Sequence, residues 1–131
     1  MTHSHQWRCA LVAIFALLLT AAGAGAAEKP LSGEEIKGLL TGSTAHGVHY
    51  GKRTTQYFSA DGSTVWKGEG DEKSSGGEWK TEGGKYCSRF PDYGNEWGCY
   101  QIALDEAQGV YYFLGEGFRA PFIIKEGNSM F

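Results

Sequence analysis

The 131-residue chain has no hydrophobic stretch long enough to cross a membrane as a helix, and it carries no excess of positive charge. Its longest unbroken apolar run, residues 10–19, has ten residues, whereas a spanning helix needs about 20. Acidic residues outnumber basic ones by 15 to 12, for a formal net charge of -3. Nucleic acids and anionic lipid surfaces attract basic proteins. We therefore expect neither nucleic acid nor, after removal of the leader described below, a membrane as a partner.

Familiar catalytic and metal-binding patterns are also missing. No G-x-S-x-G, H-E-x-x-H or C-x-x-C motif occurs, so nothing predicts a nucleophile elbow, a zinc protease or a redox pair. The glycine clusters at residues 68–77 and 115–117 are not followed by a helical pattern that could present its amides to a phosphate. We expect no catalytic residue, no cofactor and no metal ion.

The first 26 residues have the three parts of a secretory signal peptide. Arg8 supplies a positive start, residues 10–19 an apolar centre, and Ala24-Gly25-Ala26 a small-x-small cleavage site. We expect a periplasmic or secreted protein whose single domain is residues 27–131, with residues 27–31 as a short mobile lead. Removal of residues 1–26 leaves two cysteines, Cys87 and Cys99. An even count in an exported chain predicts a disulfide.

One helix is expected near the start of this domain, and strands and turns after it. A capping-box pattern at Ser32 and Glu35, followed by apolar residues at helical spacing, predicts a helix over residues 33–40. After it, turn signals recur without a second helical period. This pattern predicts a mainly β domain, a small antiparallel up-and-down β-barrel of about eight strands, with a sandwich as the alternative.

Three hairpins, centred on residues 83–84, 93 and 107, predict a register for the middle of the sheet. They place Cys87 opposite Cys99 and Ile102 opposite Tyr112. The register gathers apolar residues on one face, which we expect to be the core: Trp79, Tyr86, Phe90, Tyr100, Ile102, Leu104, Val110, Tyr112 and Leu114. The other face is charged, and there we expect a cation–π pair between Arg89 and Trp97. Pro121 predicts that the last strand is an edge or a bulged strand.

The aromatic residues of the inner face suggest the first functional hypothesis. Barrels of about eight strands can hold one small ligand, and buried phenols need partners for their hydroxyls. A non-catalytic small-ligand carrier with an aromatic interior is therefore our first hypothesis. The alternative for the interior is a solid core whose phenols bond one another. The candidate ligand-binding residues are Trp79, Tyr86, Tyr100 and Tyr112.

Two histidines, His46 and His49, remain after the leader is removed. The segment that holds them is expected to be a strand, so their side chains point to opposite faces and form no paired metal site. An enzyme is the third functional hypothesis. It requires either histidine to face a carboxylate or a hydroxyl in a cleft.

An ordered series of short motifs resembles a known family. The series is Tyr57-Phe58, Asp61-Gly62, Gly77-Glu78-Trp79, Cys87 and Trp97-Gly98-Cys99-Tyr100. It is similar to a family of small exported Gram-negative bacterial proteins of unknown function, and spans about residues 40–104. The resemblance implies a lipocalin-like β-barrel and export, and assigns no functional residue.

A looser likeness connects the chain with periplasmic lysozyme inhibitors, which insert a Ser-Gly-x-x-Tyr loop into the lysozyme cleft. Ser75-Gly76-Gly77-Glu78-Trp79 resembles this loop, with tryptophan in place of tyrosine. The resemblance implies the second hypothesis, a protein-binding inhibitor whose partner loop contains Ser75, Gly76 and Gly77. An acidic barrel suits a basic exported protein as that partner.

Overall fold

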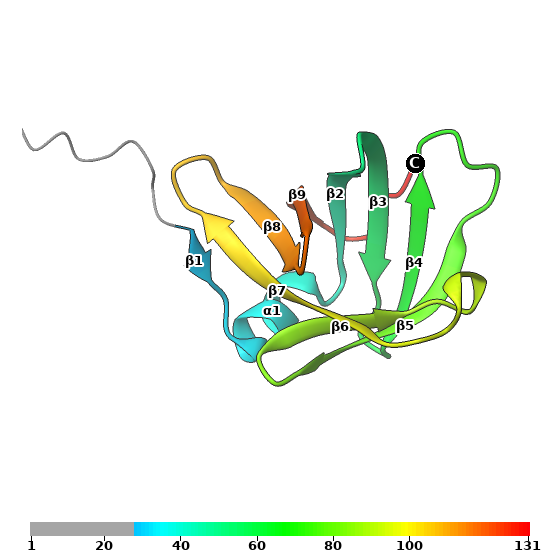
Figure 1. The fold of residues 1–131 in the computed structure, drawn as a ribbon. Helices are drawn as coiled ribbons and strands as arrows, with labels where there is room; N and C mark the ends of the chain where they lie inside the picture. The colour runs from blue at the N-terminus through cyan, green and yellow to red at the C-terminus, as the bar shows by residue number, and fades with distance from the viewer. Residues whose placement is uncertain (1–27) are drawn as a thin grey trace, which may run out of the picture.

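A computed structural model describes residues 28–131 (Figure 1), so the predicted signal peptide and its cleavage site lie outside the described residues. Within them, strands and short helices follow one another along the chain: β1 (Lys29–Pro30), α1 (Gly33–Leu40), β2 (Ser43–His49), β3 (Lys52–Phe58), β4 (Ser63–Gly68), β5 (Ser75–Glu82), β6 (Lys85–Arg89), the single 3-10 turn η1 (Pro91–Tyr93), β7 (Gly98–Asp105), β8 (Val110–Gly115) and β9 (Phe118–Glu126).

The strands β2 to β9 form a closed antiparallel barrel. Each pairs with the next in sequence, and β9 also pairs with β2, which closes the circle. In Figure 1, β2, β3 and β4 stand side by side and β5 and β6 cross below them. The eight-stranded barrel predicted from the turn spacing is thus confirmed, and the sandwich is excluded.

The short strand β1 lies outside this circle. It pairs with the second half of β7, placing Lys29 opposite Leu104 and Pro30 opposite Ala103, beyond the Tyr86–Tyr100 pair at which the β6–β7 ladder stops. Residues 29–30 were expected in a mobile lead, and that expectation is wrong because the free edge of β7 offers them backbone partners.

The helix α1 has the limits that the sequence predicts, and it closes one end of the barrel. Its capping box is formed: the Glu35 amide donates to Ser32 Oγ, and the Ser32 amide donates to Glu35 Oε1, both at 3.2 Å. Ile36 and Leu40 are fully buried in the core, and the helix contacts β2, β5 and β6. Burial of this apolar face holds the helix across the end at which β2 begins.

Two of the three predicted hairpin registers are confirmed. Trp79 lies opposite Ser88 across β5 and β6, and Cys87 lies opposite Cys99 across β6 and β7. These cysteines form the predicted disulfide, with an S–S distance of 2.09 Å. On the outer face, the Arg89 guanidinium lies 4.8 Å from the centroid of the Trp97 ring, as predicted.

The third register, between β7 and β8, is wrong by one residue. Ile102 lies opposite Phe113 and not Tyr112. The turn has four residues between the paired Asp105 and Val110. The Asp105 carboxylate accepts a hydrogen bond from the Gln108 amide, and the Asp105 carbonyl accepts one from the Gly109 amide. Gly109 has a φ of 67° there.

This shift exchanges the two faces of β8. Tyr111 and Phe113 face the core, so Val110, Tyr112 and Leu114 lie on the outer face, contrary to prediction. The Arg119 guanidinium lies 3.9 Å from the centroid of the Tyr112 ring. Because side chains alternate along a strand, one extra turn residue moves every side chain of β8 to the other face.

The strand β9 is paired on both sides, so the predicted edge position is wrong. Its ladder to β2 runs only from Ser43 to Gly47, however, and stops at the pair Gly47–Phe122, one residue short of Pro121. Pro121 has no amide hydrogen to donate. Proline is thus accommodated where the ladder ends.

Candidate functional site

The end of the barrel opposite α1 is open and contains two adjoining cavities, of about 390 and 380 Å³. The turn after β2, the connection between β6 and β7 and the turn after β8 surround this mouth. His49 and Tyr50 line both cavities. The first cavity, here called the aromatic lobe, is also lined by Lys52, Thr54, Trp66, Phe90 and Tyr93. The second, the polar lobe, is also lined by Gln56, Tyr86, Ser88, Tyr100, Phe113, Glu116 and Phe118.

In the aromatic lobe, the rings of Trp66 and Phe90 each stand nearly at right angles to the ring of Tyr93. Trp66 and Tyr93 are 6.1 Å apart between centroids, with an interplanar angle of 89°. Phe90 and Tyr93 are 6.2 Å apart at 78°. Rings in this geometry direct the edge of one toward the face of the next. All three line the lobe and none is fully buried, so an apolar or aromatic group can pack against them.

The floor of the polar lobe is a chain of hydrogen bonds between uncharged groups. The buried Gln56 donates from Nε2 to the hydroxyl oxygen of Tyr86 at 2.8 Å and to Thr64 Oγ1 at 3.0 Å. Burial raises the pKa of the Tyr86 phenol to about 12, so this hydroxyl keeps its proton at neutral pH. Both Nε2 protons are used, which leaves the Gln56 carbonyl oxygen as an acceptor.

His49 forms the wall between the two lobes. Its ring lies edge-on to Phe118 (5.6 Å, 80°) and to Phe113 (6.1 Å, 77°), and tilted against Trp66 at 6.3 Å. Burial lowers the pKa of this histidine, so the ring is neutral at pH 7. One ring nitrogen is then a donor and the other an acceptor. The site therefore contains a further uncharged hydrogen-bonding group among aromatic rings.

The structure divides the four candidate ligand-binding residues. Tyr86 and Tyr100 line the polar lobe. Trp79 is buried in the core, where its Nε1 donates to the Ser59 carbonyl at 2.9 Å, and it lines neither lobe. Tyr112 lies on the outer face because of the register shift. It is therefore corrected from an interior to a surface residue.

Sequence reasoning missed several residues that line the mouth. Trp66 shares the inner face of the sheet with Gln56, directly opposite it on β3. Along β2, His49 lies on the same face as Ala45 and Gly47, because the three residues are two positions apart. This period-two spacing is visible in the sequence, but it needs a register for β2 to β4 before it can identify the inner face.

The proposed partner loop is not a loop. Ser75, Gly76 and Gly77 belong to β5, paired with β4 through Ser75–Trp66, Gly76–Val65 and Gly77–Thr64. Ser75 is buried. At Gly77 an added Cβ would lie 2.3 Å from the Arg89 carbonyl oxygen. These three residues are fixed by sheet pairing and do not protrude, so they are corrected to a strand. Of the exposed loop expected over residues 68–77, residues 69–74 form the connection between β4 and β5.

His46 lies on the outer face and meets part of the condition set for an enzyme. Its Nε2 is 2.8 Å from Ser129 Oγ. No carboxylate within residues 28–131 hydrogen-bonds to the His46 ring, so nothing there orients it as a base. The Ser129 amide also donates to Thr44 Oγ1 at 2.9 Å. The contact therefore anchors the C-terminal segment to β2.

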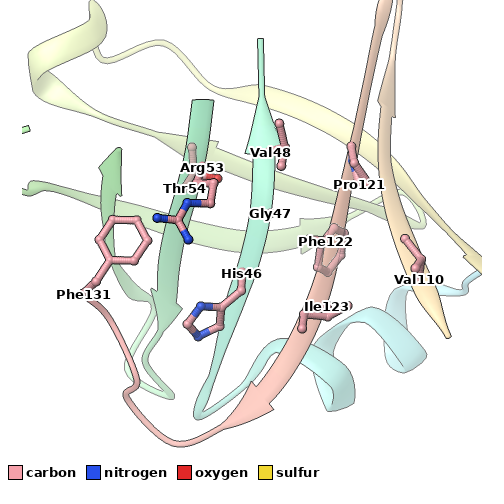
Figure 2. A pocket seen from close by; sticks show the side chains of 10 residues that line it. All are labelled: His46, Gly47, Val48, Arg53, Thr54, Val110, Pro121, Phe122, Ile123 and Phe131. Atoms are coloured by element: carbon pink, nitrogen blue, oxygen red, sulfur yellow. The ribbon is translucent and has the colours of Figure 1, made fainter. Parts of the chain in front are cut away.

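A third depression, of about 400 Å³, lies on the outer wall of the barrel around His46 (Figure 2). In Figure 2 the His46 ring lies between Phe131 of the C-terminal segment and Ile123 of β9. Its two titratable side chains are already paired, His46 with Ser129 and Arg53 with Glu69, and its other polar side chain is the buried Thr54. The rest of the lining is apolar and no set of free polar groups converges on this depression, so the mouth is the better candidate site.

Comparison with protein-family models, with curated proteins and with solved structures found no match to this chain. Within residues 28–131, no group of three or more His, Cys, Asp or Glu side chains is placed to hold a metal ion. No helix of this part of the chain is long and apolar enough to span a membrane. The functional conclusion therefore depends on the geometry of the barrel.

Proposed function

We propose that this chain is an exported, non-catalytic binding protein that holds a small molecule in the open mouth of its barrel. The observation that carries the proposal is the asymmetry of the barrel. Helix α1 closes one end, and two cavities that share His49 and Tyr50 lie at the other. Cavities of some hundreds of Å³ that combine aromatic walls with a few polar groups are typical of small-molecule sites.

Two further features support the proposal. Only part of the aromatic set packs into the core, and Trp66, Tyr93 and Tyr100 retain exposed surface around the mouth. The disulfide between Cys87 and Cys99 suits an oxidising compartment. Together with the predicted signal peptide, it supports a periplasmic or secreted location.

Native mass spectrometry of the protein, purified without denaturation from its own host, tests the proposal. We expect a species heavier than the polypeptide by the mass of a small molecule, and we expect that molecule to be lost on mild collisional activation. A matched sample of the Tyr100→Trp variant, whose larger ring would fill the polar lobe, should carry less of it. A bare polypeptide mass in both samples, at unaltered thermal stability, would overturn the proposal.

A further inference from the structure

We infer that the ligand of the mouth is an uncharged, planar ring system with a hydroxyl, carbonyl or amide group at one end. Its ring would lie in the aromatic lobe and its polar end in the polar lobe, past His49. This inference rests on the proposed function and specifies the chemistry of the same site.

The shape of the aromatic lobe favours a flat ring. Trp66 and Tyr93 form a corner, because their rings are 89° apart. A planar ligand ring in this corner stacks on one wall and presents its edge to the other, the two arrangements that aromatic pairs prefer. Phe90 adds a further wall nearly perpendicular to Tyr93. An extended acyl chain would use only a small part of these flat faces.

The charges around the mouth disfavour an anion. The cationic side chain in the lining is Lys52, and its ammonium group is already paired with Asp71 Oδ1. A buried anion needs an unpaired cation or several donors in compensation. His49 is neutral, because burial lowers its pKa.

The same charges disfavour a cation. Lys52 and Asp71 offset each other's charge beside the aromatic lobe, so this pair offers no unpaired carboxylate to a cation held against Trp66 and Tyr93. The carboxylate of the lining, Glu116, belongs to the exposed turn between β8 and β9 and lines the other lobe. A cation bound by the aromatic faces would thus have the ring faces alone, with no free carboxylate in the same lobe to offset its lost hydration.

Apart from the exposed Glu116, the polar lobe offers hydrogen bonds from uncharged groups. Tyr86 accepts from Gln56, so its own proton is available to donate. Tyr100 contributes a second phenol and Ser88 a hydroxyl, and the carbonyl oxygen of Gln56 remains an acceptor. Hydroxyl, carbonyl and amide groups match this set of donors and acceptors. A purely hydrocarbon ligand would leave them unpaired, which costs free energy in a buried site.

Four probes with the same ring but different substituents test the inference: naphthalene, 2-naphthol, naphthalene-2-sulfonate and trimethyl(2-naphthyl)ammonium. Their dissociation constants would be measured by quenching of tryptophan fluorescence and by calorimetry. We expect 2-naphthol to bind tightest, by about 10-fold over either ion, because the charged probes lose hydration without gaining a partner. It should also bind several-fold more tightly than naphthalene.

Paired tyrosine variants show whether the polar lobe makes this difference. Tyr100→Phe removes a hydroxyl at the mouth, and it should weaken 2-naphthol about 3- to 10-fold, as expected for one neutral hydrogen bond, while naphthalene binds as before. Tyr112→Phe removes a hydroxyl from the outer face and should change neither probe. Trp66→Leu should weaken both probes, and melting curves show whether each variant is folded.

The outcomes separate this inference from the proposed function. Tightest binding of the sulfonate or the ammonium probe, weakened by Trp66→Leu, would overturn the inference and leave the binding function in place. Failure of all four probes to bind up to their solubility limits would also overturn it. Mass spectrometry of the host-purified protein would then decide the binding function separately.

Discussion

Replacement of Trp79 by alanine measures how much the closed end of the barrel contributes to stability. The ring is 7% exposed, lies edge-on to Phe58 at 5.5 Å and 77°, and donates from Nε1 to the Ser59 carbonyl at 2.9 Å. Loss of a buried ring of this size costs about 3 to 5 kcal/mol. The hydrogen bond contributes about 1 kcal/mol of this. The Ser59 carbonyl is not left unpaired in the variant, because it still accepts from the Gly62 amide at 3.1 Å.

Urea denaturation followed by far-UV circular dichroism measures this cost, and Trp97→Ala is the matched control. Trp97 is 37% exposed, and its ring lies against Lys80 at 4.2 Å and Arg89 at 4.8 Å on the outer wall. Contacts of this kind contribute about 0.5 to 1 kcal/mol at exposed sites. Equal costs for the two variants, or a cost near zero for Trp79→Ala, would refute the assigned faces of β5.

Gly77, the disulfide and His49 each give a further test of the fold. Gly77→Ala should lower the free energy of unfolding by about 1 to 3 kcal/mol, because the added Cβ would lie 2.3 Å from a backbone oxygen. At Gly76 an added Cβ meets nothing within 4 Å, so Gly76→Ala should leave the urea midpoint unchanged. Joint replacement of Cys87 and Cys99 by serine should cost about 3 kcal/mol, the loop entropy of a bridge across 12 residues, and an unaltered melting temperature would contradict this. Because burial lowers the folded-state pKa of His49 below its ordinary 6.5, the unfolded chain binds the proton more readily, so stability should fall as the pH drops below about 6.5. His49→Gln should reduce that loss, and an identical pH profile in the variant would contradict the assignment.

The register of the middle strands could be predicted because two independent features agree. The Gly83-Gly84 turn and the cysteine pair each determine one hairpin, and Glu82 then lies opposite Lys85. The β7–β8 turn lacks such a signal. Its length depends on hydrogen bonds from two turn amides to Asp105, and several turn lengths are compatible with the same sequence.

The candidate site could be predicted only in part, for a related reason. Tyr86 and Tyr100 were identified because they belong to strands whose register was correct. Trp66 and His49 lie on strands for which no register was derived. Which end of the barrel is open depends on where α1 packs, a long-range contact that local sequence patterns do not specify.

The most direct test of the binding site is a proton–nitrogen correlation spectrum of the indole groups during titration with 2-naphthol. Trp66 lies at the mouth, Trp79 in the core at the closed end and Trp97 on the outer wall, so the three indole signals report three parts of the barrel. Binding in the mouth predicts a saturable shift of the Trp66 signal with Trp97 unmoved. A saturable shift of Trp97 with Trp66 unmoved would contradict it.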